Sequence, residues 1–313
     1  MNTYTHISVL RNEAVEALEP APNKIYIDCT LGLGGHTEYL LQLTQGKARI
    51  LAFDKDREAL DIAKKRLEIY GNQVTYYHRS FSELARTLEE ENITHVDGIL
   101  LDAGISSMQL DNGQRGFSFQ HEAPLDMRMD TEKGYPVSTV LARASFDTLT
   151  TILRDYGEEP LAKKIARAIV TYREKQPILQ TSQLAQIVHD AYPRTWQRSA
   201  RIHPATRTFQ ALRIYVNNEL QELQSLIEQS IPHLASGARI AIISFHSLED
   251  RIVKHSFKRY TISCICPPHI MRCECNHSPE LHILTKKPII PTQQEIATNP
   301  RSRSAKLRIA QKV

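Results

Sequence analysis

The chain has 313 residues, a formal net charge of +4 at pH 7, 41% hydrophobic residues and 24% charged residues. This composition is ordinary for folded domains and excludes disordered, fibrous and collagen-like classes, while the length predicts two domains or one large domain. No apolar run approaches about 18 residues, so we expect no membrane span. Residues 1–6 lack the basic and apolar regions of a signal peptide, so we expect a cytoplasmic protein.

Strand-like and helix-like segments alternate over the first hundred residues. Short β-rich runs predict strands over 24–30, 48–54, 74–78 and 96–102. Apolar residues at helical spacing predict a helix over 58–70. Two further helices are expected, one at 36–43 and one after Ser80-Phe81-Ser82-Glu83, which has the form of a capping box. Three successive βα units indicate a parallel sheet with helices on both faces.

The alternation stops after Asp102. Residues 107–136 show no clean period, and residues 137–207 have the apolar patterns of several helices without a convincing strand. From Thr208 onward, apolar residues at steps of three and four, continuing to Ile227, predict one long helix with a buried stripe.

The βα pattern then resumes in the last part of the chain. We expect a strand over 237–245, a helix over 247–260 that is capped by Ser247, and a closing strand over 304–310. The predicted fold class is therefore α/β, with a doubly wound, mostly parallel sheet interrupted by a helical insert. The corresponding domains are a core of residues 1–110 and 208–313, and an insert of residues 111–207.

Positive charge is concentrated in the insert region. Between Leu161 and Arg213 the net charge is +8, because only Glu174 and Asp190 oppose ten basic residues. These are Lys163, Lys164, Arg167, Arg173, Lys175, Arg194, Arg198, Arg201, Arg207 and Arg213. Such a field attracts a polyanion and positions it through phosphate contacts. A solvated helix face is the equally simple alternative.

Glycines and carboxylates follow the predicted strands. Gly32, Gly34 and Gly35 come after the first strand, Asp54 ends the second strand, and Asp102 ends the fourth strand. In doubly wound folds the ligand lies beyond these strand ends, where backbone amides face polar groups and a carboxylate commonly accepts ribose hydroxyls. Each feature alone is also typical of an ordinary turn or helix cap, but their order together predicts an adenosine-type cofactor.

The details of the loop favour one such cofactor. A dinucleotide site expects G-x-G-x-x-G, but Thr37 stands at the third glycine position. Asp28 precedes the loop, and no lysine follows in the arrangement of a nucleoside triphosphatase. The acidic setting suits ribose hydroxyls, an ammonium and a sulfonium, so S-adenosylmethionine fits better than NAD. Phe81, just after the third strand, could flank the adenine ring.

Longer strings make the chain resemble the bacterial MraW/RsmH family, methyltransferases of cytosine N4 in small-subunit ribosomal RNA. The resemblance runs from His6 to the end of the chain. It rests on Asp28-Cys29-Thr30-Leu31-Gly32-Leu33-Gly34-Gly35-His36, Leu100-Leu101-Asp102-Ala103-Gly104-Ile105-Ser106-Ser107, Arg115-Gly116-Phe117-Ser118-Phe119, Pro124-Leu125-Asp126-Met127-Arg128-Met129-Asp130, Tyr156-Gly157-Glu158-Glu159, Ile165-Ala166-Arg167-Ala168-Ile169-Val170, His203-Pro204-Ala205-Thr206-Arg207-Thr208-Phe209-Gln210-Ala211 and Ser244-Phe245-His246-Ser247-Leu248-Glu249-Asp250-Arg251.

The resemblance implies an S-adenosylmethionine-dependent enzyme with a Rossmann-like class I methyltransferase core, a helical insert for the substrate, and 16S ribosomal RNA of the small subunit as the partner. Small departures, at Cys29, Leu33 and Ala103, lie beside the implied cofactor positions. The cofactor positions that it implies are Gly34, Gly35, His36, Asp54, Phe81, Asp102 and Gln109. The oligomeric state stays open.

The catalytic residue is unknown at this stage, with two candidates. The amino group of cytosine is a poor nucleophile because its lone pair is conjugated with the ring, so an acceptor for one N–H bond would help. Asp102 could be this acceptor, and His246 after the fifth strand could act as a proton acceptor, although a histidine capping the next helix is equally expected. Phe117 and Phe119 could stack on an RNA base or pack the insert.

Four cysteines cluster near the C-terminus: Cys264, Cys266, Cys273 and Cys275, with His269 and His277 nearby. Four thiolates could hold a structural zinc, or the residues could be reduced thiols in a loop. We assign no metal ligand to the reaction. Three rival functions are an RNA-binding protein with a vestigial pocket, an NAD-dependent oxidoreductase and a DNA amino-methyltransferase.

Overall fold

The computed structural model describes residues 8–111, 113–199, 203–264, 266, 274–275 and 277–313. Among the predicted positions, His6, Arg201, His269 and Cys273 therefore lie outside the described residues, as does the side chain of Arg198. The chain forms two compact units, one of Met1–Gly104 with Leu220–Val313 and one of Ile105–Glu219. We refer to them as the core unit and the helical unit.

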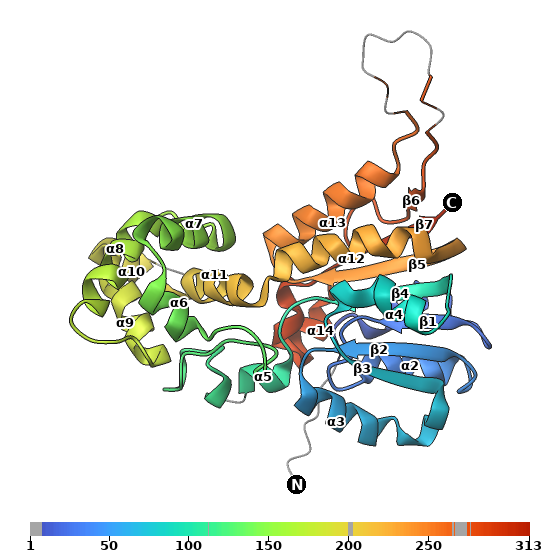
Figure 1. The fold of residues 1–313 in the computed structure, drawn as a ribbon, viewed down its shortest axis with the longest axis horizontal. Coiled ribbons are helices and arrows are strands. Elements are labelled where there is room, and N and C mark those ends of the chain that lie inside the picture. Colours follow the sequence, from blue (N-terminus) through green and yellow to red (C-terminus); the bar gives the residue numbers. More distant parts are fainter. Residues whose placement is uncertain (1–7, 112, 200–202, 265, 267–273, 276) are drawn as a thin grey trace. The chain divides into compact units, whose positions relative to one another are not determined.

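The core unit is built on one seven-stranded sheet (Figure 1). Its order is β3-β2-β1-β4-β5-β7-β6, in which neighbours from β3 to β5 are parallel and β7 is antiparallel to both β5 and β6. The strand bounds are β1 (Ile25–Asp28), β2 (Arg49–Asp54), β3 (Val74–His78), β4 (Val96–Asp102), β5 (Leu234–Ser244), β6 (Leu281–Ile283) and β7 (Lys306–Lys312). The predicted doubly wound, mostly parallel sheet is confirmed, and the strand order reverses between β1 and β4.

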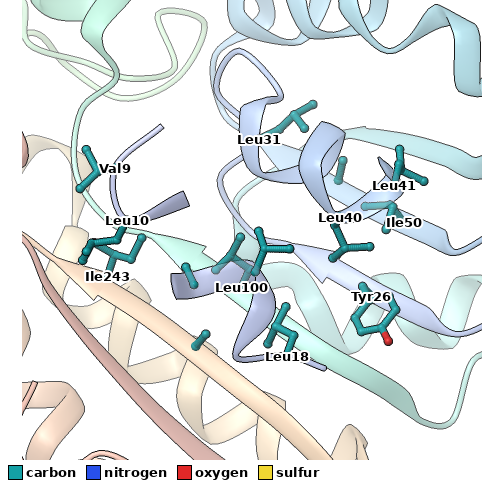
Figure 2. Packing of buried hydrophobic residues seen from close by; sticks show 14 of the residues in the cluster. Val9, Leu10, Leu18, Tyr26, Leu31, Leu40, Leu41, Ile50, Leu100 and Ile243 are labelled. Carbon is teal, nitrogen blue, oxygen red and sulfur yellow. The ribbon is translucent and has the colours of Figure 1, made fainter. Parts of the chain in front are cut away.

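Helices cover both faces of this sheet because successive strand residues point to opposite sides. Tyr26, Ile50 and Leu100 pack with α1, α2 and α3 in one cluster (Figure 2). Their sequence neighbours, such as Ile27 and Leu51, pack with α4, α12 and α13 in another. The helix bounds are α1 (Arg11–Glu16), α2 (Gly35–Leu43), α3 (Arg57–Arg66), α4 (Leu84–Glu90), α12 (Glu219–His233), α13 (Ser247–Tyr260) and α14 (Gln293–Thr298).

The helical unit has its own apolar core, made of buried side chains from its helices. Its longest helices, α7, α8, α9 and α11, carry buried faces of Leu, Ile and Ala residues at helical spacing. The helix bounds are α5 (Ser107–Asp111), α6 (Val137–Arg143), α7 (Phe146–Gly157), α8 (Ala162–Arg173), α9 (Thr181–Ala191), α10 (Arg194–Ser199) and α11 (Ala205–Asn217).

The expected long helix from Thr208 is wrong. Two helices, α11 and α12, replace it, because Asn218 between them adopts the left-handed conformation at φ 53°. Asparagine tolerates this conformation better than most residues and often ends a helix this way. The apolar residues keep the same spacing in the sequence on both sides of Asn218. The sequence pattern therefore gives no sign of the break.

The boundaries of the two units also differ from the expected ones at 110/111 and 207/208. The helical unit runs from Ile105 to Glu219, because α11 packs with α7 and α9 and contributes Phe209 and Leu212 to their shared core. The assignment of separate functions to the two units stays a prediction.

Two smaller expectations at element ends are corrected by local contacts. The cap of α13 is His246 and not Ser247. Ser80 caps the 3₁₀ turn Phe81–Glu83 by accepting the Ser82 N–H, and α4 begins only at Leu84. The short strand β6 was not predicted. Within the described ranges, no helix is long and apolar enough to cross a membrane.

Candidate functional site

Asp28 ends β1, and both of its carboxylate oxygens accept hydrogen bonds. Its Oδ1 accepts the Thr30 N–H at 3.1 Å, and its Oδ2 accepts the Thr37 hydroxyl at 2.7 Å. Burial raises the pKa of Asp28 to about 6. Thr37, which stands where a dinucleotide fingerprint has its third glycine, is itself buried. The threonine at this position therefore donates a buried hydrogen bond to the aspartate that precedes the loop.

The glycine loop requires its glycines for geometric reasons. Gly34 begins α2 at φ 80°, a left-handed conformation that glycine adopts without strain. A side chain on Gly35 would collide with the Ser8 hydroxyl, because the segment before α1 passes closely over the loop. The start of α2 is thus fixed from both sides, and its first backbone N–H groups are held at the carboxyl end of β1.

Asp54 ends β2 and is bonded to the same loop. Its Oδ2 accepts the Gly32 N–H at 2.8 Å, and its Oδ1 accepts the Asp56 N–H at 2.8 Å. Burial raises its pKa to about 6, although part of the side chain reaches solvent. Each carboxylate oxygen can accept more than one hydrogen bond, so Asp54 keeps acceptor capacity for the hydroxyl groups of a ligand.

Asp102 ends β4, next to β1 at the point where strand order reverses. Its N–H donates to the Thr30 hydroxyl at 2.8 Å, but its buried Oδ1 has no hydrogen-bond partner among the described residues. Burial, together with the negative charges of Asp28 and Glu249, holds the pKa of Asp102 well above its usual range. A buried acceptor without a partner is costly, and it marks a place that a polar or cationic ligand would complete.

His36 lies in the first turn of α2 and is buried. Its Nε2 lies 3.0 Å from the Val9 carbonyl, an acceptor, so this nitrogen carries the proton in the neutral ring. Its Nδ1 is 4.0 Å from Asp102 Oδ2. Burial lowers the pKa of His36 to about 4, so the ring is neutral at pH 7. Its evident structural role is to tie the segment before α1 to the glycine loop.

Phe81 is partly buried immediately after β3. The Lys55 ammonium lies 5.8 Å from the centre of its ring, and Lys55 also forms an ion pair with Glu222. The ring packs against the apolar cluster that includes residues of α4 and α12, and it remains a candidate for flanking a planar ligand.

His246 is bonded at the start of α13, as the helix-cap alternative expected. Its Nδ1 accepts the Glu249 N–H at 3.4 Å, and Glu249 Oε2 accepts the backbone N–H groups of Phe245 and His246 at 2.8 and 3.2 Å. This is a reciprocal capping box. It supports a structural role for the ring, and the catalytic role of His246 stays a prediction.

Three candidate residues lie in the helical unit. Gln109 is buried in α5, where its Oε1 accepts the Ser106 N–H at 3.0 Å. Phe117 is only 7% exposed and belongs to the apolar core, and the Phe119 ring packs on Phe209 with centroids 5.0 Å apart. Phe117 therefore packs inside the helical unit, whereas Phe119 is only partly buried, and stacking on an RNA base stays a prediction for it.

The basic residues of the helical unit fall into two groups. Arg173 caps α6 by donating to the carbonyls of Leu141 and Ala144, and Arg213 forms an ion pair with Glu219 at 2.8 Å. Lys163 and Lys164, by contrast, are exposed on α8. Some of the basic residues that give the +8 charge therefore stabilise the helical unit itself. The exposed face of α8 is where we expect the remaining charge to meet a polyanion.

Sequence reasoning missed Thr30 and the segment at Ser8 and Val9. Thr30 joins β1 to β4 through its bonds with Asp28 and Asp102. The only sequence signal was a hydroxyl residue two positions after a strand-ending aspartate, which is common. The site therefore contains three carboxyl groups, those of Asp28, Asp54 and Asp102, each with a raised pKa. A cation and hydroxyl donors beside them would lower these pKa values.

Comparison with known proteins matches the chain over almost its whole length. The sequence profile of the MraW methylase family covers residues 3–313. The chain is 48% identical over 314 residues to the "Ribosomal RNA small subunit methyltransferase H" of Geotalea uraniireducens, covering 100% of both. It is 48% identical over 310 residues to the protein of that name from Caldicellulosiruptor bescii, covering 99% of this chain and 100% of the relative. With identities at this level along its whole length, the chain belongs to the MraW methylase family, a family of methyltransferase enzymes.

Proposed function

We propose that this chain is an S-adenosylmethionine-dependent methyltransferase that methylates the N4 amino group of a cytidine in 16S ribosomal RNA of the small subunit. The observation that carries the proposal is the full-length match to relatives named as small-subunit ribosomal RNA methyltransferases. It agrees with the acidic strand ends of the core unit. A ribosomal RNA substrate also accounts for the cytoplasmic location that we expect.

The residues at the strand ends fit this methyl donor. The unpartnered Oδ1 of Asp102 and the raised pKa of Asp28 and Asp54 favour a ligand with positive charge. Asp54 would accept the ribose hydroxyls, Asp102 would face the cationic part, and Phe81 would flank the adenine. Gly34, Gly35, His36 and Gln109 complete the proposed set. A diphosphate cofactor fits less well, since carboxylates repel it and Thr37 occupies the glycine position that its binding loop uses.

The methyl group of S-adenosylmethionine is already activated by the sulfonium, so the chain mainly has to orient the two reactants. Holding reactants in line can contribute about 7–11 kcal/mol in favourable cases. An oxygen that accepts one N4–H bond localises the nitrogen lone pair and then takes up the displaced proton. Asp102 is the better candidate for this acceptor, because its Oδ1 lacks a partner among the described residues. Both ring nitrogens of His246 instead face Glu249, since Nδ1 accepts its N–H and Nε2 lies 3.1 Å from its Oε1.

The test offers labelled S-adenosylmethionine and the chain to small ribosomal subunits, 70S particles, naked ribosomal RNA and duplex DNA, followed by nucleoside analysis. We expect label in N4-methylcytidine of 16S ribosomal RNA. Label in DNA alone, or in another nucleoside, would contradict the proposal. The same assay distinguishes the rival functions, because an RNA-binding protein with a vestigial pocket or an oxidoreductase transfers no methyl group.

Replacing Asp54 tests the location of the cofactor pocket. Asp54→Ala removes two expected hydrogen bonds to a charged acceptor, at about 1.5–3 kcal/mol each, so we expect a loss of cofactor affinity of about 100-fold or more. RNA affinity should stay close to wild type. Isothermal titration with the cofactor and filter binding with RNA measure the two effects, and Lys286→Gln in the same unit is the control. Unchanged cofactor affinity in Asp54→Ala would show that the pocket lies elsewhere.

A further inference from the structure

The segment 261–280 joins α13 to β6 and takes no part in the proposed reaction. Its base is closed by a backbone hydrogen bond in which the Glu280 N–H donates to the Tyr260 carbonyl at 2.8 Å. Three cysteines stand on its two arms, Cys264 and Cys266 on the first and Cys275 on the second.

These three thiols converge. Their Sγ atoms all lie within 4.8 Å of one another, and the Cys275 and Cys264 Sγ atoms are 3.8 Å apart. A disulfide needs about 2.05 Å, so no covalent bond joins the sulfurs of Cys264 and Cys275. Thiolates arranged tetrahedrally at about 2.3 Å from a zinc ion are about 3.8 Å apart. The observed spacing is therefore that of ligands around one small cation.

The surroundings also suit thiolates better than buried thiols. Cys264 is exposed and Cys266 and Cys275 are partly exposed, whereas Cys29 on β1 is fully buried in the apolar core, as structural cysteines usually are. The backbone N–H of Glu274 points at Cys266 Sγ at 3.4 Å. Such N–H groups stabilise sulfur ligands of a bound metal and fix their orientation.

We propose that Cys264, Cys266 and Cys275 bind one thiophilic divalent cation, of the Zn²⁺ type, that staples the two arms of this segment. Binding releases the thiol protons to solvent, because the thiolate is the ligand. Structural zinc sites take four ligands, so a fourth group completes the site. The three described thiols carry the proposal, and Cys273, the remaining cysteine of the segment, lies outside the described residues.

The experiment measures metal on the full-length protein after growth with added zinc and extensive dialysis. We expect about one equivalent of zinc by elemental analysis. Exchange for Co²⁺ should produce thiolate charge-transfer bands and the intense visible bands of a tetrahedral site. Cys264→Ser, Cys266→Ser and Cys275→Ser should each lower the affinity for Co²⁺ at least tenfold, while Cys29→Ala, the matched control outside the segment, should keep both the metal and the spectrum.

Thiol titration gives a second readout that does not depend on activity. In the loaded protein the cysteines of the segment should react slowly with a thiol reagent, and a chelator should make them react rapidly. The proposal is overturned if the purified chain lacks metal and shows no cobalt spectrum. It is also overturned if each of the three serine variants holds as much metal as the wild type, or if the bound metal is an iron–sulfur cluster with its own visible absorption.

Discussion

At the scale of single residues, the site is defined by carboxyl groups that are difficult to ionise in the unliganded chain. Burial raises the pKa of Asp28 and of Asp54 to about 6, and burial together with neighbouring negative charge holds the pKa of Asp102 well above its usual range. Hydrogen bonds from Thr30, Thr37 and Gly32 offset only part of the rise in pKa that burial causes. A cationic ligand supplies the missing counter-charge.

These shifts predict a pH dependence of cofactor affinity. A cation favours the ionised carboxylates and lowers their pKa in the complex, so below about pH 6 binding must first release protons. We expect the affinity for S-adenosylmethionine to fall by about tenfold per coupled carboxyl of Asp28 and Asp54 between pH 7 and pH 5. Asp102, whose pKa is held well above its usual range, should extend the dependence to higher pH. Calorimetry in buffers of different ionisation enthalpy measures both the affinity and the released protons.

S-adenosylhomocysteine is the matched ligand for this prediction, since it lacks the sulfonium charge and should show a weaker dependence on pH. Asp54→Asn should flatten the dependence for both ligands. An affinity for S-adenosylmethionine that does not change between pH 5 and pH 7 would contradict the proposed contact between the carboxyl groups and the cation.

The two roles considered for His246 make opposite predictions. As the cap of α13, it can be replaced by Asn, which caps helices well, whereas Ala should cost about 1 kcal/mol of stability. We therefore expect His246→Asn to keep near wild-type unfolding stability and methyl transfer, and His246→Ala to be less stable. Denaturant unfolding and the pH profile of kcat measure this. A stable His246→Asn variant that loses turnover would instead identify the ring as a proton acceptor.

At the scale of elements, the loop between β1 and α2 and the exposed face of α8 have different electrostatic character. The loop lies among carboxylates, whereas α8 presents Lys163 and Lys164 to solvent, with Arg167 stacked 4.6 Å from the centre of the Phe146 ring. Alternation of buried and exposed residues along α8 keeps Ile165 and Ile169 in the core while these cations stay outside.

If α8 binds RNA phosphates, removing its charges should weaken RNA binding without touching the cofactor. Lys163→Gln with Lys164→Gln should lower the slope of log affinity against log salt by about 0.7–0.9 for each phosphate that is no longer neutralised. Filter binding of small subunits across a salt series measures the slope. The control pair is Lys286→Gln with Lys287→Gln, two exposed lysines of the core unit. Equal effects in both pairs would mean that α8 is only a solvated face.

At the scale of the whole molecule, the chain forms two separately packed units, and we predict that cofactor binding and substrate binding are divided between them. The core unit has two apolar clusters, one on each face of its sheet, and the helical unit has a third. Each unit therefore has enough buried apolar surface to be locally stable, and ligand binding to one should protect that unit first.

Hydrogen exchange with and without S-adenosylmethionine tests this division. A ligand that binds the native state stabilises it by about 2.7 kcal/mol at 100 times its Kd. We expect slower exchange at the glycine loop and at the carboxyl ends of β1, β2 and β4, and little change in α7, α8 and α9. Protection confined to the helical unit would contradict the placement of the cofactor in the core unit.

The order of strands and helices could be predicted from the sequence, because buried parallel strands are short apolar runs and helices show a 3.6-residue period. Asp28, Asp54 and Asp102 could be placed near one another for the same reason, since parallel strands end at one edge of the sheet. The break at Asn218 and the cap at His246 could not, because each depends on one backbone conformation or one local hydrogen bond that leaves the apolar period unchanged.

The sequence by itself determined the fold class, the family and the choice of an acidic, adenosine-type site, because periodicity, strand-end residues and long shared strings are local in the chain. Only the tertiary structure decided that Asp102 has a buried oxygen without a partner among the described residues, that Thr37 bonds Asp28, that Phe117 lies in the apolar core, and that three cysteine sulfurs converge. These properties depend on distances and burial in the folded chain, and no local pattern encodes them.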